Sequence, residues 1–141
     1  MKWLVTALVV VALAGTFLVE QAVTGAGSAA KATATVHLTI RHSRFEPDHV
    51  VVPADTTVTF VVDNTDPIGH ELIIGDAGVQ ERHEKGTEPY HPPRPGEVSV
   101  PAGTTQQTTF TFGTANGITY ACHLPGHFAY GMHGTVDVTS R

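Results

Sequence analysis

Four side chains in this sequence carry donor atoms that suit a soft transition metal. Cys122, His127 and Met132 lie in one short stretch near the C-terminus, where residues 120–132 read YACHLPGHFAYGM, and His70 lies well before them. A thiolate, two imidazoles and a weak axial thioether form the ligand set of a type 1 copper site. The sequence therefore predicts one copper ion, Cu(I)/Cu(II), with His70, Cys122 and His127 as the trigonal ligands and Met132 as the axial ligand.

Each of these residues also has a simpler interpretation. A single cysteine is often a small buried apolar residue, and a methionine often fills a gap in the core. His70 could be a hydrogen-bonded strand histidine, and a Cys/His/His set with an open fourth position also suits zinc, although zinc gains little from a thioether. A dinuclear copper centre needs two cysteines, and the chain has only Cys122.

The elements that would position these ligands are short strands. Residues 34–40 alternate apolar and polar side chains, the pattern of a half-buried strand. Further strands are expected near residues 49–52, 56–62, 70–74, 98–100, 107–112, 118–122 and 134–138, separated by Pro, Gly and Asp/Asn turns. This series predicts an all-β, Greek-key β-sandwich over residues 32–141. Within it, His70 would begin one strand, Cys122 end another and Met132 precede the last.

The C-terminal stretch together with His70 resembles the copper loop of the cupredoxins, the plastocyanin and azurin kind. Residues 45–58 resemble the early strands of small bacterial cupredoxins. The resemblance implies a cupredoxin-like fold with His70, Cys122, His127 and Met132 on the ligand positions. Glu71 departs from the family, in which an Asn often follows the first histidine and supports the Cys loop.

His123 needs a separate explanation, because Cys-His-x-x-x-His followed by Met also resembles the last copper motif of multicopper oxidases. Their trinuclear cluster requires several His-x-His pairs, and this sequence contains none. We therefore expect His123 to be an outward-facing polar residue.

A long polar connection separates the expected strands in the middle of the chain. Residues 76–97 are rich in proline and contain His83 and His91. We expect an irregular inserted loop whose histidines, like His133, are solvated. A second, looser metal site or a partner-docking role for this loop are the alternatives, since long loops in compact domains are often functional.

Residues 1–30 are set apart by composition. Lys2 is followed by an apolar run from Trp3 to Val19 and then by small residues. This pattern predicts a signal peptide or an uncleaved membrane anchor, and hence an exported domain, periplasmic or extracellular. The net charge of −5 and the lack of a basic stripe argue against nucleic-acid binding.

These expectations combine into one functional hypothesis. The protein is expected to be an electron carrier rather than an enzyme, passing single electrons to a cytochrome or oxidase-type partner that docks transiently near His127. The alternatives are a copper carrier that delivers the ion and a copper-binding module of a larger oxidase. Contact with a membrane is expected only through the N-terminal segment, and only if that segment is not cleaved.

Overall fold

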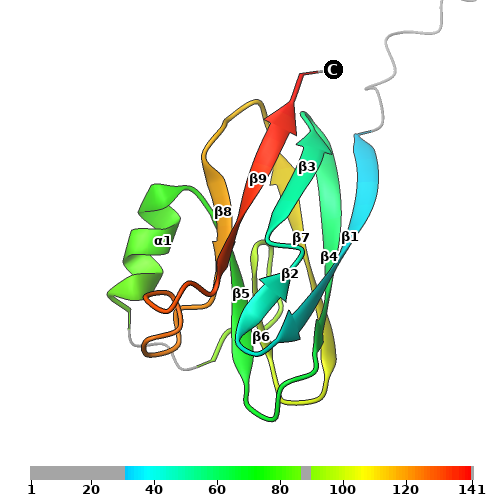
Figure 1. Ribbon diagram of the computed structural model, residues 1–141. Helices are drawn as coiled ribbons and strands as arrows, with labels where there is room; N and C mark the ends of the chain where they lie inside the picture. Colours follow the sequence, from blue (N-terminus) through cyan, green and yellow to red (C-terminus); the bar gives the residue numbers. More distant parts are fainter. Residues whose placement is uncertain (1–30, 87–89, 141) are drawn as a thin grey trace, which may run out of the picture.

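The computed structural model describes residues 31–86 and 90–140, which form two packed β-sheets (Figure 1). The segment expected to be a signal peptide or anchor, residues 1–30, lies outside the described residues. The four-stranded sheet has the order β2-β1-β4-β7 and the five-stranded sheet the order β3-β9-β8-β5-β6. The elements are β1 (Ala32–Arg41), β2 (Arg44–Glu46), β3 (His49–Pro53), β4 (Thr56–Asn64), β5 (His70–Gly75), α1 (Ala77–Glu84), β6 (Glu97–Val100), β7 (Thr105–Phe112), β8 (Ile118–Ala121) and β9 (His133–Thr139).

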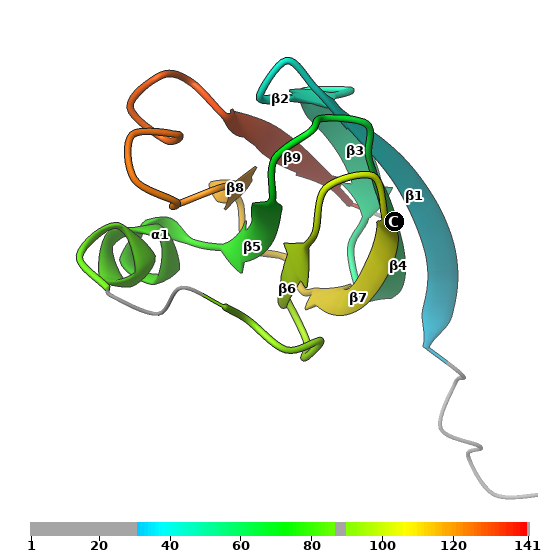
Figure 2. The ribbon, with the colours of Figure 1, turned by 90° about the horizontal axis from the view of Figure 1, so that it is seen from below.

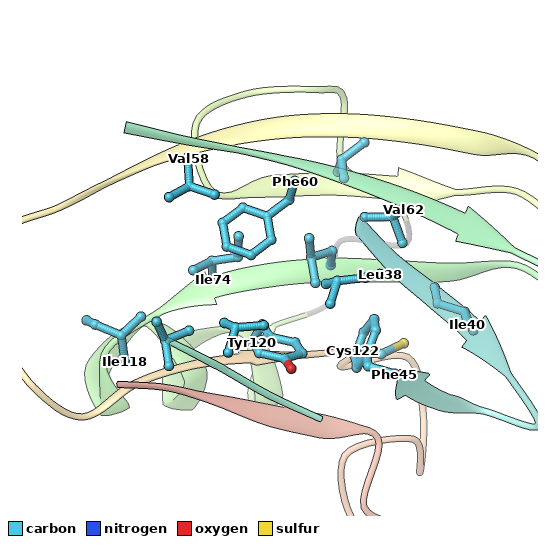
Figure 3. Packing of buried hydrophobic residues seen from close by; sticks show 14 of the residues in the cluster. Leu38, Ile40, Phe45, Val58, Phe60, Val62, Ile74, Ile118, Tyr120 and Cys122 are labelled. Atoms are coloured by element: carbon cyan, nitrogen blue, oxygen red, sulfur yellow. The ribbon is translucent and has the colours of Figure 1, made fainter. Parts of the chain in front are cut away.

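The core lies between the two sheets, and alternation along the strands explains how it forms. In β4, Val58, Phe60 and Val62 are fully buried, while the residues between them are partly exposed. Successive side chains of a strand point to opposite faces, so these three residues share the inward face. Figure 3 shows them packed with residues of the opposite sheet, among them Ile74 and Tyr120. The predicted β-sandwich is confirmed.

Strand β5 differs from the others, because all six of its residues are buried. It lies inside its sheet between β8 and β6, and α1 packs beside β5 and β8 (Figure 2). A strand covered on both faces loses the alternating pattern and reads as a continuous apolar run. This burial matters for function, since β5 begins with His70.

Helix α1 was not expected, because the connection from residue 76 to residue 97 was predicted to be irregular. The helix begins where the Asp76 side chain accepts a hydrogen bond from the Val79 N–H, at 2.9 Å. It is anchored by Gln80, whose amide donates to the carbonyl oxygen of Thr119 at 3.0 Å. A polar anchor and an N-cap give no apolar stripe, which is the signal that usually reveals a surface helix.

Tyr120 fixes the approach of β8 to β9 next to the predicted copper loop. It is fully buried, and its hydroxyl donates to the Pro47 carbonyl at 2.7 Å. Its cross-strand partner is Gly134, where an added Cβ would lie 2.2 Å from the Tyr120 ring. Only glycine leaves room for the ring at this position. Burial also raises the pKa of Tyr120 above its ordinary value, so the hydroxyl remains a donor.

Within the described residues, no helix has both the length and the apolar character needed to cross a membrane.

Candidate metal centre

The sheet and one closed loop bring the predicted ligands to the same end of the sandwich. His70 is the first residue of β5, Cys122 directly follows β8, and Met132 directly precedes β9. Because β5 and β8 are antiparallel neighbours, the start of β5 lies beside the end of β8. The loop is closed by backbone bonds from Cys122 N–H to the Met132 carbonyl, 3.1 Å, and from Met132 N–H to the His127 carbonyl, 3.0 Å.

Three of the four predicted ligands present their donor atoms to one point. Nδ1 of His127 lies 3.3 Å from Nδ1 of His70 and 3.2 Å from Sγ of Cys122. These ligand atoms all lie within 4.8 Å of one another. His70 and Cys122 are buried, whereas His127 is partly exposed. Met132 is fully buried and belongs to the same hydrophobic cluster as Cys122.

His70 is oriented by a buried carboxylate that the sequence did not reveal as part of the site. Nε2 of His70 lies 2.9 Å from Oδ2 of Asp66, which leaves Nδ1 directed at the other donors. Asp66 accepts hydrogen bonds from the backbone N–H groups of His42, 2.7 Å, and Ser43, 2.8 Å. Both of these residues have positive φ, near 52°, which directs their N–H groups at the carboxylate. A carboxylate behind a ligating imidazole is a common support in metal sites.

Burial and hydrogen bonding set the protonation of this pair. Burial alone would raise the pKa of Asp66, but the N–H donors of Ser43 and His42 and the contact with His70 outweigh it and lower the pKa. Burial lowers the pKa of His70, the contact with Asp66 opposes this, and the charge of His127 lowers it further. At neutral pH the pair is therefore a carboxylate and a neutral imidazole with an available lone pair.

Cys122 is held as a thiol until a cation replaces its proton. Burial raises the pKa of Cys122 to about 12, although the backbone N–H groups of Leu124 and Glu71 partly oppose this shift. The thiolate, not the thiol, is the metal ligand. Two imidazole Nδ1 atoms and one buried sulfur so close together fit a copper ion, which accepts both kinds of donor.

Comparison with known proteins decides the family. The model of the family described as "Cupredoxin-like domain" matches residues 7–89, more than half of the chain. This chain belongs to the cupredoxin-like family. The matched region includes His70 and ends before the Cys122 loop, so it confirms the resemblance to the cupredoxins at the level of the family.

Relatives of this cupredoxin include proteins named "Copper-resistant cuproprotein CopI". The protein of Rubrivivax gelatinosus is 34% identical over 116 residues, covering 79% of this chain and 70% of its own length. The protein of Vibrio cholerae is 33% identical over 115 residues, covering 77% of this chain and 68% of its own length.

Among solved structures, auracyanin B has a TM-score of 0.60 at 24% identity, covering 75% of this chain and 88% of its own length. Auracyanin A, a "blue" copper protein of Chloroflexus aurantiacus, has a TM-score of 0.60 at 23% identity, covering 76% and 99%. At these identities the structural likeness shows the fold alone.

Glu71 supports the Cys loop of this cupredoxin at the position where an Asn is frequent in the family. Its Oε1 accepts a hydrogen bond from the His123 N–H at 2.8 Å, and its own N–H is directed at the sulfur of Cys122. The side chain is only 3% exposed. Glu71 thus provides the bond across to the loop that the departure from the family pattern had put in doubt.

The expectation that His123 faces outward is wrong. Its side chain is 2% exposed and lies between α1 and the loop. Nδ1 is 2.7 Å from Oε2 of Glu84, Nε2 is 2.7 Å from Oε1 of Gln80, and the ring stacks on Phe128 at 5.0 Å. The physical reason is α1, which covers this face and was not predicted.

The same helix accounts for two further corrections. His83 and His91 were expected to be solvated, but their side chains are 15% and 3% exposed. His133, by contrast, is exposed as expected.

Proposed function

We propose that this protein is a type 1 copper protein that carries single electrons outside the cytoplasm. The observation that supports this most strongly is the convergence of His70 Nδ1, Cys122 Sγ and His127 Nδ1 within 4.8 Å. His70, Cys122, His127 and Met132 are the proposed ligands of one copper ion. When bound, copper would supply a Cu(I)/Cu(II) couple at this point.

The contribution of the chain is to hold the ligands before the metal arrives. Asp66 fixes the ring of His70. Backbone hydrogen bonds hold the loop that carries the second imidazole, since the backbone N–H of His127 donates to the Leu124 carbonyl at 2.9 Å. Ligands that are already in place move little when the charge at the site changes. A small rearrangement favours fast one-electron exchange.

Exposure differs among the ligands and suggests where electrons enter and leave. His70 and Cys122 are buried in the sandwich, while the edge of His127 reaches the surface beside Pro125 and Phe128. Tyr130, on the same loop, is 79% exposed. A cytochrome or oxidase-type protein would dock here through a small transient interface, as redox partners commonly do. The protein itself performs no catalysis in this proposal.

Export is the second part of the proposal. The apolar segment between Lys2 and the small residues before residue 30 would direct the domain to the periplasm or the cell exterior, and would provide the only membrane contact if it is retained.

Copper delivery is the second candidate function. The relatives at 34% and 33% identity are named copper-resistant cuproproteins, a description that says nothing of electron transfer. A delivery protein would use the same donors but release the ion to an acceptor.

Repeated reduction and oxidation of the copper-loaded protein separates the two functions. The protein is cycled by film voltammetry in the presence and absence of a Cu(I) chelator, and bound copper is measured after each cycle. An electron carrier keeps its copper and gives the same reversible one-electron wave in both conditions. Loss of copper to the chelator on the first reduction would reject electron carriage and favour delivery.

A further inference from the structure

A second group of metal-binding side chains includes His83 of α1 and shares no residue with the centre described above. We propose that His83, His91 and Glu97 form a site for a divalent late transition metal ion of the Cu²⁺ or Zn²⁺ class. Their ligand atoms lie within 4.8 Å of one another. They line a cavity of about 430 Å³, whose other lining residues are Glu71, Arg82, Gly86, Arg94 and His123. Two imidazoles and one carboxylate around an open position is a recurrent arrangement for such ions.

His83 has the orientation of a metal ligand. Its Nδ1 lies 2.9 Å from the Val79 carbonyl, an acceptor, so Nδ1 carries the proton. Nε2 is then the atom with the lone pair, and it lies 3.5 Å from Oε1 of Glu97. A backbone carbonyl that holds one ring N–H and presents the other nitrogen is the usual support of a ligating histidine.

Glu97 divides its two oxygens between different partners. Oε2 accepts from Nε of Arg94 at 2.6 Å, while Oε1 faces His83. Burial would raise the pKa of Glu97, but the hydrogen bond and charge of Arg94 outweigh it and lower the pKa. Glu97 is therefore a carboxylate at neutral pH, with Oε1 available to a cation. The guanidinium of Arg94 weakens the electrostatic attraction of Glu97 for a cation. Binding therefore depends on the imidazole nitrogens, which disfavours Mg²⁺ and Ca²⁺ because these ions prefer oxygen ligands.

His91 lies between this group and the buried carboxylate of Glu71, one oxygen of which has no hydrogen-bond donor among the described residues. Nδ1 of His91 lies 3.3 Å from Oε2 of Glu97, and Nε2 lies 3.3 Å from Oε2 of Glu71. Among the described residues, this Glu71 oxygen makes no hydrogen bond, although the side chain is 3% exposed. A buried acceptor without a hydrogen bond is costly. A metal on Nδ1 of His91 would place the proton on Nε2, facing Glu71, and so complete a carboxylate–histidine–metal arrangement.

Glu71 also separates the two sites while touching both. Its Oε1 holds the N–H of His123 beside Cys122, and its Oε2 faces His91. The two proposed metal sites share no ligand, so each can be tested while the other is intact.

The test uses the full protein carrying one equivalent of copper, to which Cu²⁺ is added and followed by electron paramagnetic resonance. One further equivalent with an ordinary tetragonal signal and nitrogen couplings is expected, and Zn²⁺ added first should block it. His83→Gln and Glu97→Gln should each weaken binding at least tenfold. His49→Gln is the matched control, because His49 also pairs with a carboxylate, Asp137 at 3.0 Å, but lies on β3; it should bind as the parent does.

Absence of a further equivalent, or its retention in both His83→Gln and Glu97→Gln, would overturn the proposal. Thermal unfolding of each variant shows whether it folds. If His83→Gln does not fold, the metal affinity of Glu97→Gln decides the proposal. If the type 1 copper proposal is wrong, the first equivalent of copper will bind without a thiolate-to-copper band. The second site is then tested by titrating Zn²⁺ into a Cys122→Ser protein, and that result decides this proposal independently.

Discussion

The buried thiol of Cys122 gives a quantitative prediction about how copper affinity depends on pH. Burial raises its pKa from the ordinary 9.0 to about 12, while the lowered pKa of His70 leaves that ring neutral. At pH 7 about one molecule in 10⁵ of the metal-free protein would carry the thiolate, against about one in 10² for an ordinary thiol. The difference amounts to about 4 kcal/mol of affinity. Binding must therefore expel one proton from Cys122.

The expected result is that the apparent affinity for Cu(I) rises about tenfold per pH unit from pH 7 to beyond pH 10, because metal binding and proton release are linked. The affinity is measured anaerobically by competition with a chelator of known pH dependence, and proton release by calorimetry in buffers of different ionisation enthalpy. Cys122→Ser should lose the steep dependence. A curve that flattens near pH 9, or release of much less than one proton per ion, would show that burial does not hold the thiol protonated and would refute the reasoning.

Four substitutions test other parts of the structure. Met132→Leu should keep the blue colour and raise the reduction potential, measured by voltammetry; loss of all copper would contradict a weak axial role. Asp66→Asn removes the negative charge behind His70, which stabilises the oxidised site more than the reduced site. If that difference in stabilisation is about 1.4 kcal/mol, the substitution should raise the reduction potential by about 60 mV, and an unchanged potential would contradict this. Tyr120→Phe should lower the free energy of unfolding by about 1 kcal/mol without altering the spectrum. Gly134→Ala, which drives a Cβ into the Tyr120 ring, should cost about 3 kcal/mol in denaturant titrations; equal stability of these two variants would contradict the packing described.

The strands could be predicted from the sequence because the buried side chains follow the alternation of apolar and polar residues. Strand β4 alternates along nearly its whole length, and its inward residues Val58, Phe60 and Val62 are the ones that the alternation predicts. The proposed type 1 copper ligands could be predicted for a different reason. Cys122, His127 and the start of β5 could be placed together because one loop and one strand pair determine their positions.

What the sequence did not reveal depends on polar contacts between distant segments. Helix α1 is held by the Asp76 cap and by Gln80 rather than by an apolar face, so its sequence resembles a loop. Once that helix was missed, the burial of His123 and His83 was missed with it. The short strand β2 carries only three residues, too few to show alternation.

The support of His70 by Asp66 illustrates the same limit at the metal centre. The two residues are four apart in a turn, where neither helical nor strand periodicity applies, and the carboxylate is fixed by N–H groups of a distant turn at residues 42–43. Only the folded chain brings these segments together.

The most direct test of the central claim is the visible and paramagnetic-resonance spectrum of the protein reconstituted with one equivalent of Cu(II). We predict an intense thiolate-to-copper band with the narrow copper hyperfine splitting of a type 1 site, both abolished in Cys122→Ser. A colourless protein with ordinary tetragonal copper signals, unchanged by that substitution, would contradict the account.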